Sequence, residues 1–349
     1  MEKNIPINKG NYSLDTCERE ELFNRNRAFG VEDAYAENRA QWEELPRQCQ
    51  VADYPLLVDL ELSSLCNLNC PFCYTLADGF KEKVRATLMD FGLFKKVVDE
   101  ISGKVFGIRL SLRGEPTIHP DFIEAVRYAK SKGVQEVSTL TNGSNLTSEF
   151  FTRAMEAGID WITVSFDGLD VEYEKNRRPL KFEEMYQRLA EISRIKKCAG
   201  RVKPVIKIQS VWPAIERNPA EFYEKMALVS DLVAFNPIID YSAQAAAQKI
   251  PYEKDFICPQ LYQRLVVGAD GRVLLCANDE QSEHIIGDAR TQTIHDIWHG
   301  KPMNEVRQMH RQQDGFLQMP LCCKCYLPRC TREHAVQVSG RTVVVRNYR

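Results

Sequence analysis

The stretch CNLNCPFC, residues 66–73, places three cysteines in the spacing C-x3-C-x2-C directly after a short β-rich run, Leu57–Leu62. Three thiolates can hold three irons of a [4Fe–4S] cluster and leave the fourth iron without a protein ligand. An open metal position is where chemistry takes place, whereas a closed four-ligand site is usually structural. Cys66, Cys70 and Cys73 are therefore candidate ligands of a reactive cluster. Close cysteines can also form most of a zinc site, and the triplet alone leaves that alternative open.

The overall composition is that of a soluble globular protein: 349 residues, 44% hydrophobic and 27% charged. A net charge of −2 gives no electrostatic case for binding nucleic acid or an anionic membrane. No run approaches the ~20 apolar residues of a membrane span, and the polar N-terminus is unlike a signal peptide. The twelve cysteines then favour metal ligands or reduced thiols over disulfides, so we expect a cytoplasmic, reducing environment.

After a polar, mainly helical extension at 1–55, β-rich runs alternate with amphipathic helical stretches, the signature of a parallel sheet or barrel. The expected strands are Leu57–Leu62, Gly107–Leu112, Val134–Leu140, Trp161–Phe166, Val205–Gln209 and Leu232–Phe235. The expected helices include Asp90–Ile101, Asp121–Lys132, Ser148–Ala157 and Glu183–Ala199. Six units are fewer than the eight of a closed barrel. We therefore predict an α/β fold, with a partial (β/α)6 TIM-like barrel at 56–245 and a small α+β domain at 246–349.

Polar motifs follow the predicted strands at their C-terminal ends, where a parallel barrel gathers its reactive groups. They are RGEP at 113–116, TNG at 141–143 and SFDG at 165–168. Together with the cysteine triplet, these motifs resemble the radical S-adenosylmethionine (SAM) superfamily over residues 56–240. The resemblance implies that SAM binds the open iron of the cluster. It also implies reductive cleavage of SAM to a 5′-deoxyadenosyl radical that abstracts a substrate hydrogen.

The same resemblance implies roles for single residues. RGEP is similar to a Gly-Gly-Glu motif that contacts the amino group of SAM, although Arg113 replaces its first glycine. Gly114 and Glu115 therefore carry the motif, and the Glu115 carboxylate suits an ammonium partner. The other SAM contacts that the resemblance implies are Phe72, Asn142, Ser165, Asp167 and either Arg177 or Arg178. For the two arginines, a solvated charge beside a helix is the alternative.

A second set of cysteines lies in the C-terminal part of the chain. Cys258 and Cys276 flank two β-rich runs joined by Ala-Asp-Gly, a hairpin turn signal. Four further cysteines follow, and the whole set resembles the half-length "twitch" version of the SPASM domain, which binds one auxiliary [4Fe–4S] cluster. The implied ligands are Cys258, Cys276, Cys322 and Cys325, with Cys330 as an alternative ligand and Cys323 as a bystander. A zinc ribbon with four thiolates is the other interpretation.

We expect a radical SAM oxidoreductase that oxidises a sugar-like or aminocyclitol small molecule by two electrons. The auxiliary cluster would accept an electron, and a flavodoxin or ferredoxin would reduce the first cluster. A peptide-modifying maturase and a redox-neutral epimerase or eliminase are alternatives, and a non-enzymatic zinc or iron–sulfur scaffold is a remote one. Asp279 is a candidate general base, with a solvated turn carboxylate as the alternative. His295 and His299 are spaced as metal ligands on a helix, or as its exposed surface.

Overall fold

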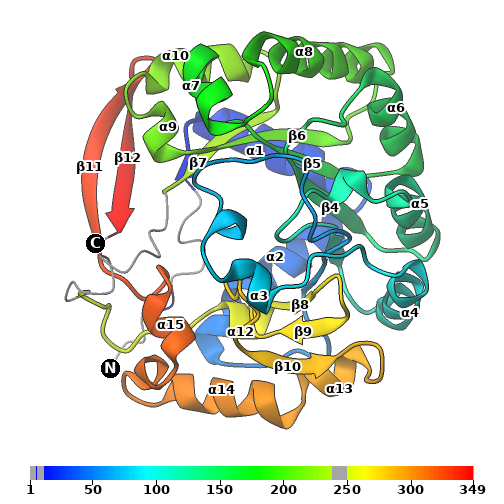
Figure 1. Cartoon of the computed structure of the whole chain (residues 1–349), viewed down its shortest axis with the longest axis vertical. Coiled ribbons are helices and arrows are strands. Elements are labelled where there is room, and N and C mark those ends of the chain that lie inside the picture. Colours follow the sequence, from blue (N-terminus) through cyan, green and yellow to red (C-terminus); the bar gives the residue numbers. More distant parts are fainter. Residues whose placement is uncertain (1–4, 6–11, 238–249, 349) are drawn as a thin grey trace.

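The computed structural model describes residues 5, 12–237 and 250–348. Its centre is a curved sheet of parallel strands that neighbour one another in chain order, so that the sheet forms an open barrel (Figure 1). The parallel strands are β2 (Leu57–Leu60), β3 (Gly107–Arg109), β4 (Glu136–Thr141), β5 (Trp161–Ser165), β6 (Val205–Val211) and β7 (Leu232–Asn236). The predicted α/β class and all six predicted strands are confirmed.

Amphipathic helices cover the outer face of this sheet (Figure 1). The N-terminus of helix α4 (Phe91–Ile101) is capped by Asp90, whose carboxylate accepts the Leu93 N–H at 2.9 Å. One side of α4 is buried. Helix α6 (Ser148–Ala157) ends at Gly158, which has φ +94°. The covering helices are α4 (Phe91–Ile101), α5 (Phe122–Ser131), α6 (Ser148–Ala157) and α8 (Phe182–Cys198). These four helices confirm the predicted ones, to within one or two residues at each end.

The N-terminal extension closes one end of the barrel. Helices α1 (Cys17–Ala28) and α2 (Glu32–Gln48) lie behind the strands in the view of Figure 1. Arg27 of α1 donates to both carboxylate oxygens of Glu136, at 2.5 and 2.7 Å, at the start of β4. The Arg27 guanidinium also stacks over the Trp161 ring at 4.3 Å. The extension therefore covers the N-terminal ends of the strands, opposite the motifs.

The C-terminal region continues the barrel sheet. The predicted hairpin forms from β8 (Arg264–Val267) and β9 (Arg272–Leu274), but β8 also pairs in parallel with β2. With β10 (Ile285–Asp288) and the short β1 (Tyr12–Ser13), the sheet has ten strands within the described residues. The predicted boundary between residues 245 and 246 lies outside the described residues.

The remaining elements surround this sheet. Beside the barrel lie α3 (Phe80–Lys83), α7 (Asp170–Asn176), α9 (Trp212–Ile215) and α10 (Pro219–Ala227). The C-terminal part adds α12 (Gln260–Gln263), α13 (Ile294–Trp298), α14 (Lys301–Arg311), α15 (Pro320–Lys324) and the hairpin of β11 (Thr331–Val338) with β12 (Arg341–Tyr348). Within the described parts of the chain, no helix is long and apolar enough to cross a membrane.

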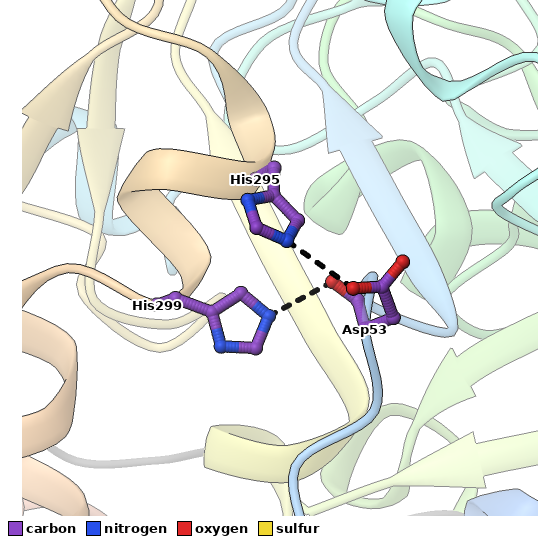
Figure 2. A group of neighbouring side chains, drawn as sticks. All are labelled: Asp53, His295 and His299. Carbon is purple, nitrogen blue, oxygen red and sulfur yellow. Dashed lines mark hydrogen bonds and ion pairs between the residues drawn. The ribbon is translucent and has the colours of Figure 1, made fainter.

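The segment before β2 is fastened to α13 by hydrogen bonds (Figure 2). The His299 Nε2 lies 2.9 Å from the Asp53 carbonyl, and the His295 Nε2 lies 3.2 Å from the Asp53 carboxylate. The Trp298 indole also donates to the carbonyl of Ala52 at 2.9 Å. The carbonyl oxygen and the carboxylate oxygen of Asp53 accept hydrogen bonds, so the Nε2 atoms of both imidazoles donate them. A metal ion would instead bind through a lone pair on each of these nitrogens. This geometry favours a docking contact over a metal site.

Candidate active site

The first thiol group consists of Cys66, Cys70 and Cys73, on the loop that follows β2. Cys66 is exposed, Cys70 is buried and Cys73 is half-buried. Burial is the main cause that raises the pKa of Cys66 and raises that of Cys70 to about 11, and the nearby Cys73 thiol adds to both shifts. The three thiols are therefore close neighbours. Thiolates in such a group are stabilised by binding a cation.

Hydrogen-bond donors surround these thiols. The Asn142 amide nitrogen lies 3.9 Å from the Cys66 sulfur, and the Thr75 hydroxyl lies 3.0 Å from the Cys73 sulfur. A guanidinium nitrogen of Arg177 lies 3.9 Å from the Cys70 sulfur. Donors and a cation around the sulfurs fit an anionic iron–sulfur cluster, because they stabilise its thiolate ligands.

The RGEP motif packs directly against the cysteine loop. A Cβ on Gly114 would lie 2.3 Å from the carbonyl oxygen of Leu65, so only glycine fits there. The Glu115 N–H donates to that same oxygen at 2.8 Å. The Glu115 carboxylate accepts the Thr141 hydroxyl at 2.6 Å on one oxygen and the Asn142 N–H at 2.6 Å on the other. The second oxygen keeps a lone pair for a further donor, as an ammonium contact requires.

Arg113, which replaces a glycine of the family motif, serves a different contact. Its buried side chain forms a bidentate ion pair with Glu61, in which its Nε lies 2.7 Å from the carboxylate. A terminal nitrogen also donates to the Ser282 hydroxyl at 2.8 Å. The arginine therefore connects the end of β2 to a loop of the C-terminal region and leaves the backbone of Gly114 and Glu115 in place.

Asp167 and Arg177 form a buried pair beside the cysteine loop. The Asp167 carboxylate accepts the Val211 N–H at 2.9 Å with one oxygen and pairs with Arg177 through the other. The Arg177 guanidinium lies 5.8 Å from the centre of the Phe72 ring. Arg177 is thus held where it can meet an anionic group of a ligand on the loop, with Phe72 alongside.

The two remaining predicted SAM contacts differ in their surroundings. Arg178 has an exposed side chain, and its carbonyl accepts the Asn69 N–H at 3.1 Å. Ser165 is half-buried at the C-terminal end of β5, opposite Gln209 of β6. Of the two arginines proposed for a carboxylate, the structure brings Arg177 and not the Arg178 side chain to the first thiol group.

The second thiol group consists of Cys258, Cys276, Cys322 and Cys325. Burial raises the pKa of Cys258 to about 12 and that of Cys276 well above its ordinary value, and the nearby Cys325 thiol adds to both. Cys258, Cys322 and Cys325 all act electrostatically on Cys276. The structure therefore brings these four cysteines together, at the ends of the hairpin and around α15. Four neighbouring thiols, of which Cys258 is buried and the others are half-buried, match the ligand set of a closed cluster.

Neutral donors face the second thiol group. The Asn278 amide donates to the Cys325 sulfur at 3.3 Å. The buried His310 accepts the Cys258 N–H on its Nδ1 at 3.4 Å, and its Nε2 lies 3.5 Å from the Cys322 sulfur. Because Nδ1 is the acceptor, Nε2 carries the proton and donates to the sulfur. Burial lowers the pKa of His310 to about 4, so the imidazole is neutral. Nothing in the sequence around His310 marks it for this position.

The other two C-terminal cysteines point elsewhere or lie further along the chain. The Cys323 sulfur faces the carbonyl of Leu317 at 3.3 Å, away from its neighbour. Cys330 directly precedes β11, where its N–H donates to the Pro251 carbonyl at 2.9 Å. The ligand set with Cys322 and Cys325 thus has the better geometric support, and Cys330 as a replacement ligand stays a prediction.

A cavity of about 570 Å³ is lined by residues of the barrel strands and by residues that are next to cysteines of both thiol groups in the sequence. Tyr74, next to Cys73, lies on its wall, and so do Asn278 and Tyr326, which neighbour Cys276 and Cys325 in the sequence. At the other end, Arg27 and Trp42 of the N-terminal helices line it. Side chains from the strands complete the wall, among them Arg109, Ser138, Thr139, Leu140, Trp161, Thr163, Lys207 and Gln209. A cavity of this size suits a small molecule.

Two adjacent carboxylates beside the cavity have different surroundings. Asp279 is fully buried, and its two oxygens accept the N–H groups of Glu283 and His284 at 2.8 and 2.9 Å. The solvated-turn alternative for Asp279 is therefore wrong, because this carboxylate closes its own loop. Glu280 instead lines the cavity. Burial raises the pKa of Glu280 to about 8, although Arg113 acts against that shift.

Comparison with known families agrees with both thiol groups. The radical SAM superfamily matches residues 60–201, and an iron–sulfur cluster-binding domain, SPASM, matches residues 258–326. The chain contains a radical SAM domain followed by a SPASM domain. These domains imply that the chain binds SAM, a [4Fe–4S] cluster and an auxiliary iron–sulfur site. The cysteine sulfurs and the hydrogen-bond donors described above fit such clusters.

Curated relatives match about a third of this chain. The AdoMet-dependent heme synthase of Methanosarcina barkeri is 33% identical over 124 residues, which is 36% of this chain and 34% of that protein. The tungsten-containing aldehyde ferredoxin oxidoreductase cofactor-modifying protein of Pyrococcus furiosus is 35% identical over 112 residues, 32% of this chain and 30% of that protein. The matched region thus spans about a third of the length of these relatives.

Solved structures resemble a larger share of the chain. The complex of BtrN with AdoMet and 2-DOIA has a TM-score of 0.53 at 20% identity, and the match covers 76% of this chain and 91% of BtrN. Streptococcus suis SuiB bound to S-adenosylmethionine has a TM-score of 0.55 at 14% identity, covering 89% of this chain and 83% of SuiB. At such identities the likeness shows the radical SAM fold alone.

Proposed function

We propose that this radical SAM enzyme oxidises a small, hydroxyl-bearing molecule, sugar-like or an aminocyclitol, by two electrons. The observation that carries the proposal is a cavity whose wall includes residues from the loops of both thiol groups. When bound, SAM and the first cluster supply a 5′-deoxyadenosyl radical that removes a substrate hydrogen, and one auxiliary cluster supplies an acceptor for the second electron. The chain's own residues bind and orient these groups.

Cys66, Cys70 and Cys73 would hold the first cluster, and Cys258, Cys276, Cys322 and Cys325 the auxiliary one. The free lone pair of Glu115 would accept the ammonium of SAM, and Arg177 would face its carboxylate. Gly114, Asn142, Ser165, Asp167 and Phe72 are proposed to position the rest of SAM, and Arg178 stays the weaker candidate. Helices α1 and α2 exclude water from the closed end of the barrel.

Glu280 is our candidate for the proton acceptor. Removing two hydrogens from an alcohol releases a proton that must leave the carbon–oxygen centre. Asp279 has both oxygens engaged by backbone N–H groups, whereas Glu280 lines the cavity and has a pKa of about 8. A general base works best when its pKa lies near the operating pH. We therefore assign this role to Glu280 in place of Asp279.

The cavity also bears on the alternatives. SuiB has been solved with its precursor peptide SuiA and shares this fold, so the fold does not separate a peptide substrate from a small one. The small-molecule proposal is supported by a cavity of about 570 Å³ that α1 and α2 cover at its far end. A flavodoxin or ferredoxin is the proposed one-electron donor, as expected in the cytoplasm.

The test is mass spectrometry of metabolite extracts incubated anaerobically with the reconstituted, reduced enzyme and SAM. We expect a small molecule to be replaced by a product that lacks two hydrogens, together with 5′-deoxyadenosine. A product of unchanged mass would support the redox-neutral alternative instead. A product found only when peptides are supplied would support a maturase.

A further inference from the structure

The inner part of the cavity holds a buried lysine without a counter-charge. Lys207 lies on β6, is 8% exposed, and its side chain lines the cavity. Among the described residues, no carboxylate lies within ion-pair distance of its ammonium group; its nearest aromatic neighbour is the Trp161 ring, 5.9 Å away. Burial and the charges of Arg27 and Arg109 lower the pKa of Lys207 to about 8. An unpaired buried cation destabilises a folded protein unless a ligand neutralises it.

The neighbouring carboxylates are already committed to arginines. Asp59 pairs with two of them, Arg109 at 2.9 Å and Arg264 at 2.5 Å. Glu136 accepts both hydrogen bonds from Arg27. Three guanidinium groups therefore share two carboxylates around the same cavity, and Lys207 adds a further cation. The inner part of the cavity has an excess of positive charge.

Unpaired neutral groups lie on the same wall. Within the described parts of the chain, the Gln209 amide nitrogen, the Thr139 hydroxyl and the Trp161 indole nitrogen are buried without a hydrogen-bond partner. Gln209 is two residues beyond Lys207 on β6, so it faces the cavity one pleat closer to the C-terminal strand ends. Buried polar groups normally have partners, so these atoms indicate a polar ligand.

We propose that the substrate carries an anionic group, a carboxylate or a phosphate, which Lys207 binds at the inner end of the cavity. Gln209 and Thr139 then contact the hydroxyl groups of the substrate. Lys207 lies nearer to the N-terminal end of β6 than Gln209 does. The anionic group of the substrate therefore points toward α1 and α2, and the rest of the substrate points toward the first thiol group. This inference rests on the proposed function and narrows its substrate from a sugar-like molecule to an acidic one.

Binding of matched sugars to the SAM-loaded, anaerobically reconstituted protein tests this inference. The probes are D-glucose, D-glucuronate and D-glucose 6-phosphate, each measured by calorimetry against the wild type, Lys207→Met and Lys207→Arg. A hydrogen bond to a charged group contributes about 1.5–3 kcal/mol, so an acidic sugar should bind roughly ten- to a hundred-fold more tightly than glucose. We expect Lys207→Met to lose this preference and Lys207→Arg to keep it.

The acidic sugar that binds better identifies the source of the charge, carboxylate or phosphate. The proposal is overturned if glucose binds as tightly as both acidic sugars, or if Lys207→Met keeps the preference. It is also overturned if neither acidic sugar binds at millimolar concentration. None of these measurements involves SAM cleavage or electron transfer, so their failure is distinct from failure of the proposed oxidation.

Thermal unfolding of the ligand-free protein gives a second, independent readout. Lys207→Met should raise the unfolding temperature, because it removes an unpaired buried charge. Lys197→Met on the exposed surface of α8 is the matched control and should change neither the unfolding temperature nor the sugar preference. If Lys207→Met unfolds at a lower temperature than this control, the lysine stabilises the fold and the anion-binding role is contradicted.

Discussion

The two thiol groups differ in the number of their thiols, in burial and in the charge of the side chains around them. The first has three thiols on a loop at the open end of the barrel, and one of them, Cys66, is exposed. The second has four thiols enclosed by a hairpin and α15, and Cys258 is buried among them. Three ligands leave an iron open to SAM, whereas four close a cluster to exogenous ligands. The contrast is consistent with our proposal that the first group serves bond cleavage and the second electron transfer.

Their surroundings differ in the same direction. The cationic Arg177 lies beside Cys70, whereas neutral donors, Asn278 and His310, face the sulfurs of the second group. A cation can meet the carboxylate of SAM as well as a thiolate. Neutral hydrogen bonds to the sulfurs of a closed cluster chiefly adjust its reduction potential. Each of the following experiments tests one of the two thiol groups or the wall of the cavity.

Removal of the first thiol group should have the largest effect. We expect the wild type to carry about eight iron and eight sulfide per chain, for two cubane clusters. The combined change of Cys66, Cys70 and Cys73 to Ala should remove about half of this iron and all SAM cleavage, measured as 5′-deoxyadenosine. Changing the exposed Cys17 and Cys198 to Ala is the control and should alter neither. A wild type with only half the expected iron would indicate zinc or no metal at the second group.

Glu280→Gln tests the proposed proton acceptor in the cavity wall. General acid–base catalysis typically contributes 10²–10⁴-fold, so we expect product formation to slow by roughly a hundredfold. The pKa of Glu280 is raised to about 8, so the basic carboxylate forms as the pH rises. The wild-type rate should therefore increase with pH and level off above pH 8, and the variant should lose this increase. An unchanged pH profile in the variant would contradict the role of Glu280.

Glu115→Ala tests the open position of the first group. Loss of one hydrogen bond to a charged group costs about 1.5–3 kcal/mol, or roughly ten- to a hundred-fold in SAM affinity. The iron content should stay unchanged, because Glu115 is proposed to contact SAM and not iron. Equilibrium binding of SAM to the reconstituted protein measures the effect. Unaltered affinity would refute the proposed ammonium contact.

His310→Phe tests the second group and should have the smallest effect. The variant removes the hydrogen bond to Cys322, worth about 1 kcal/mol, which is on the order of 40 mV for a one-electron couple. The less stabilised reduced cluster should have a lower potential, measured by a redox titration followed by electron paramagnetic resonance. The potential of the first cluster should not move. A shift of both potentials would mean that His310 acts on the fold as a whole.

The positions of the strands and of the motifs could be predicted from the sequence, because both depend on local patterns. Alternating apolar runs located β2 to β7, and turn residues such as Gly114 marked the loops at their ends. The parallel pairing of β8 with β2 was not predicted, since pairing between distant strands leaves no local pattern.

Within the site, the cysteine pattern and the family resemblance predicted which thiols gather, whereas the side chains that join them from other elements were missed. Lys207 is one polar strand residue among several in the sequence, because its lack of a partner depends on where the fold places Asp59 and Glu136. Asp279 and Glu280 are adjacent carboxylates that sequence cannot distinguish. Backbone N–H groups engage one of them, and the cavity faces the other.

Spectroscopy of the reduced, fully reconstituted protein with and without SAM tests the contrast between the groups most directly. We predict that SAM changes the electron paramagnetic resonance and Mössbauer signals of one [4Fe–4S] cluster, because only the first thiol group leaves an iron open. The signals of the cluster at Cys258, Cys276, Cys322 and Cys325 should stay the same. A change in both clusters, or in neither, would contradict the assignment of an open and a closed site.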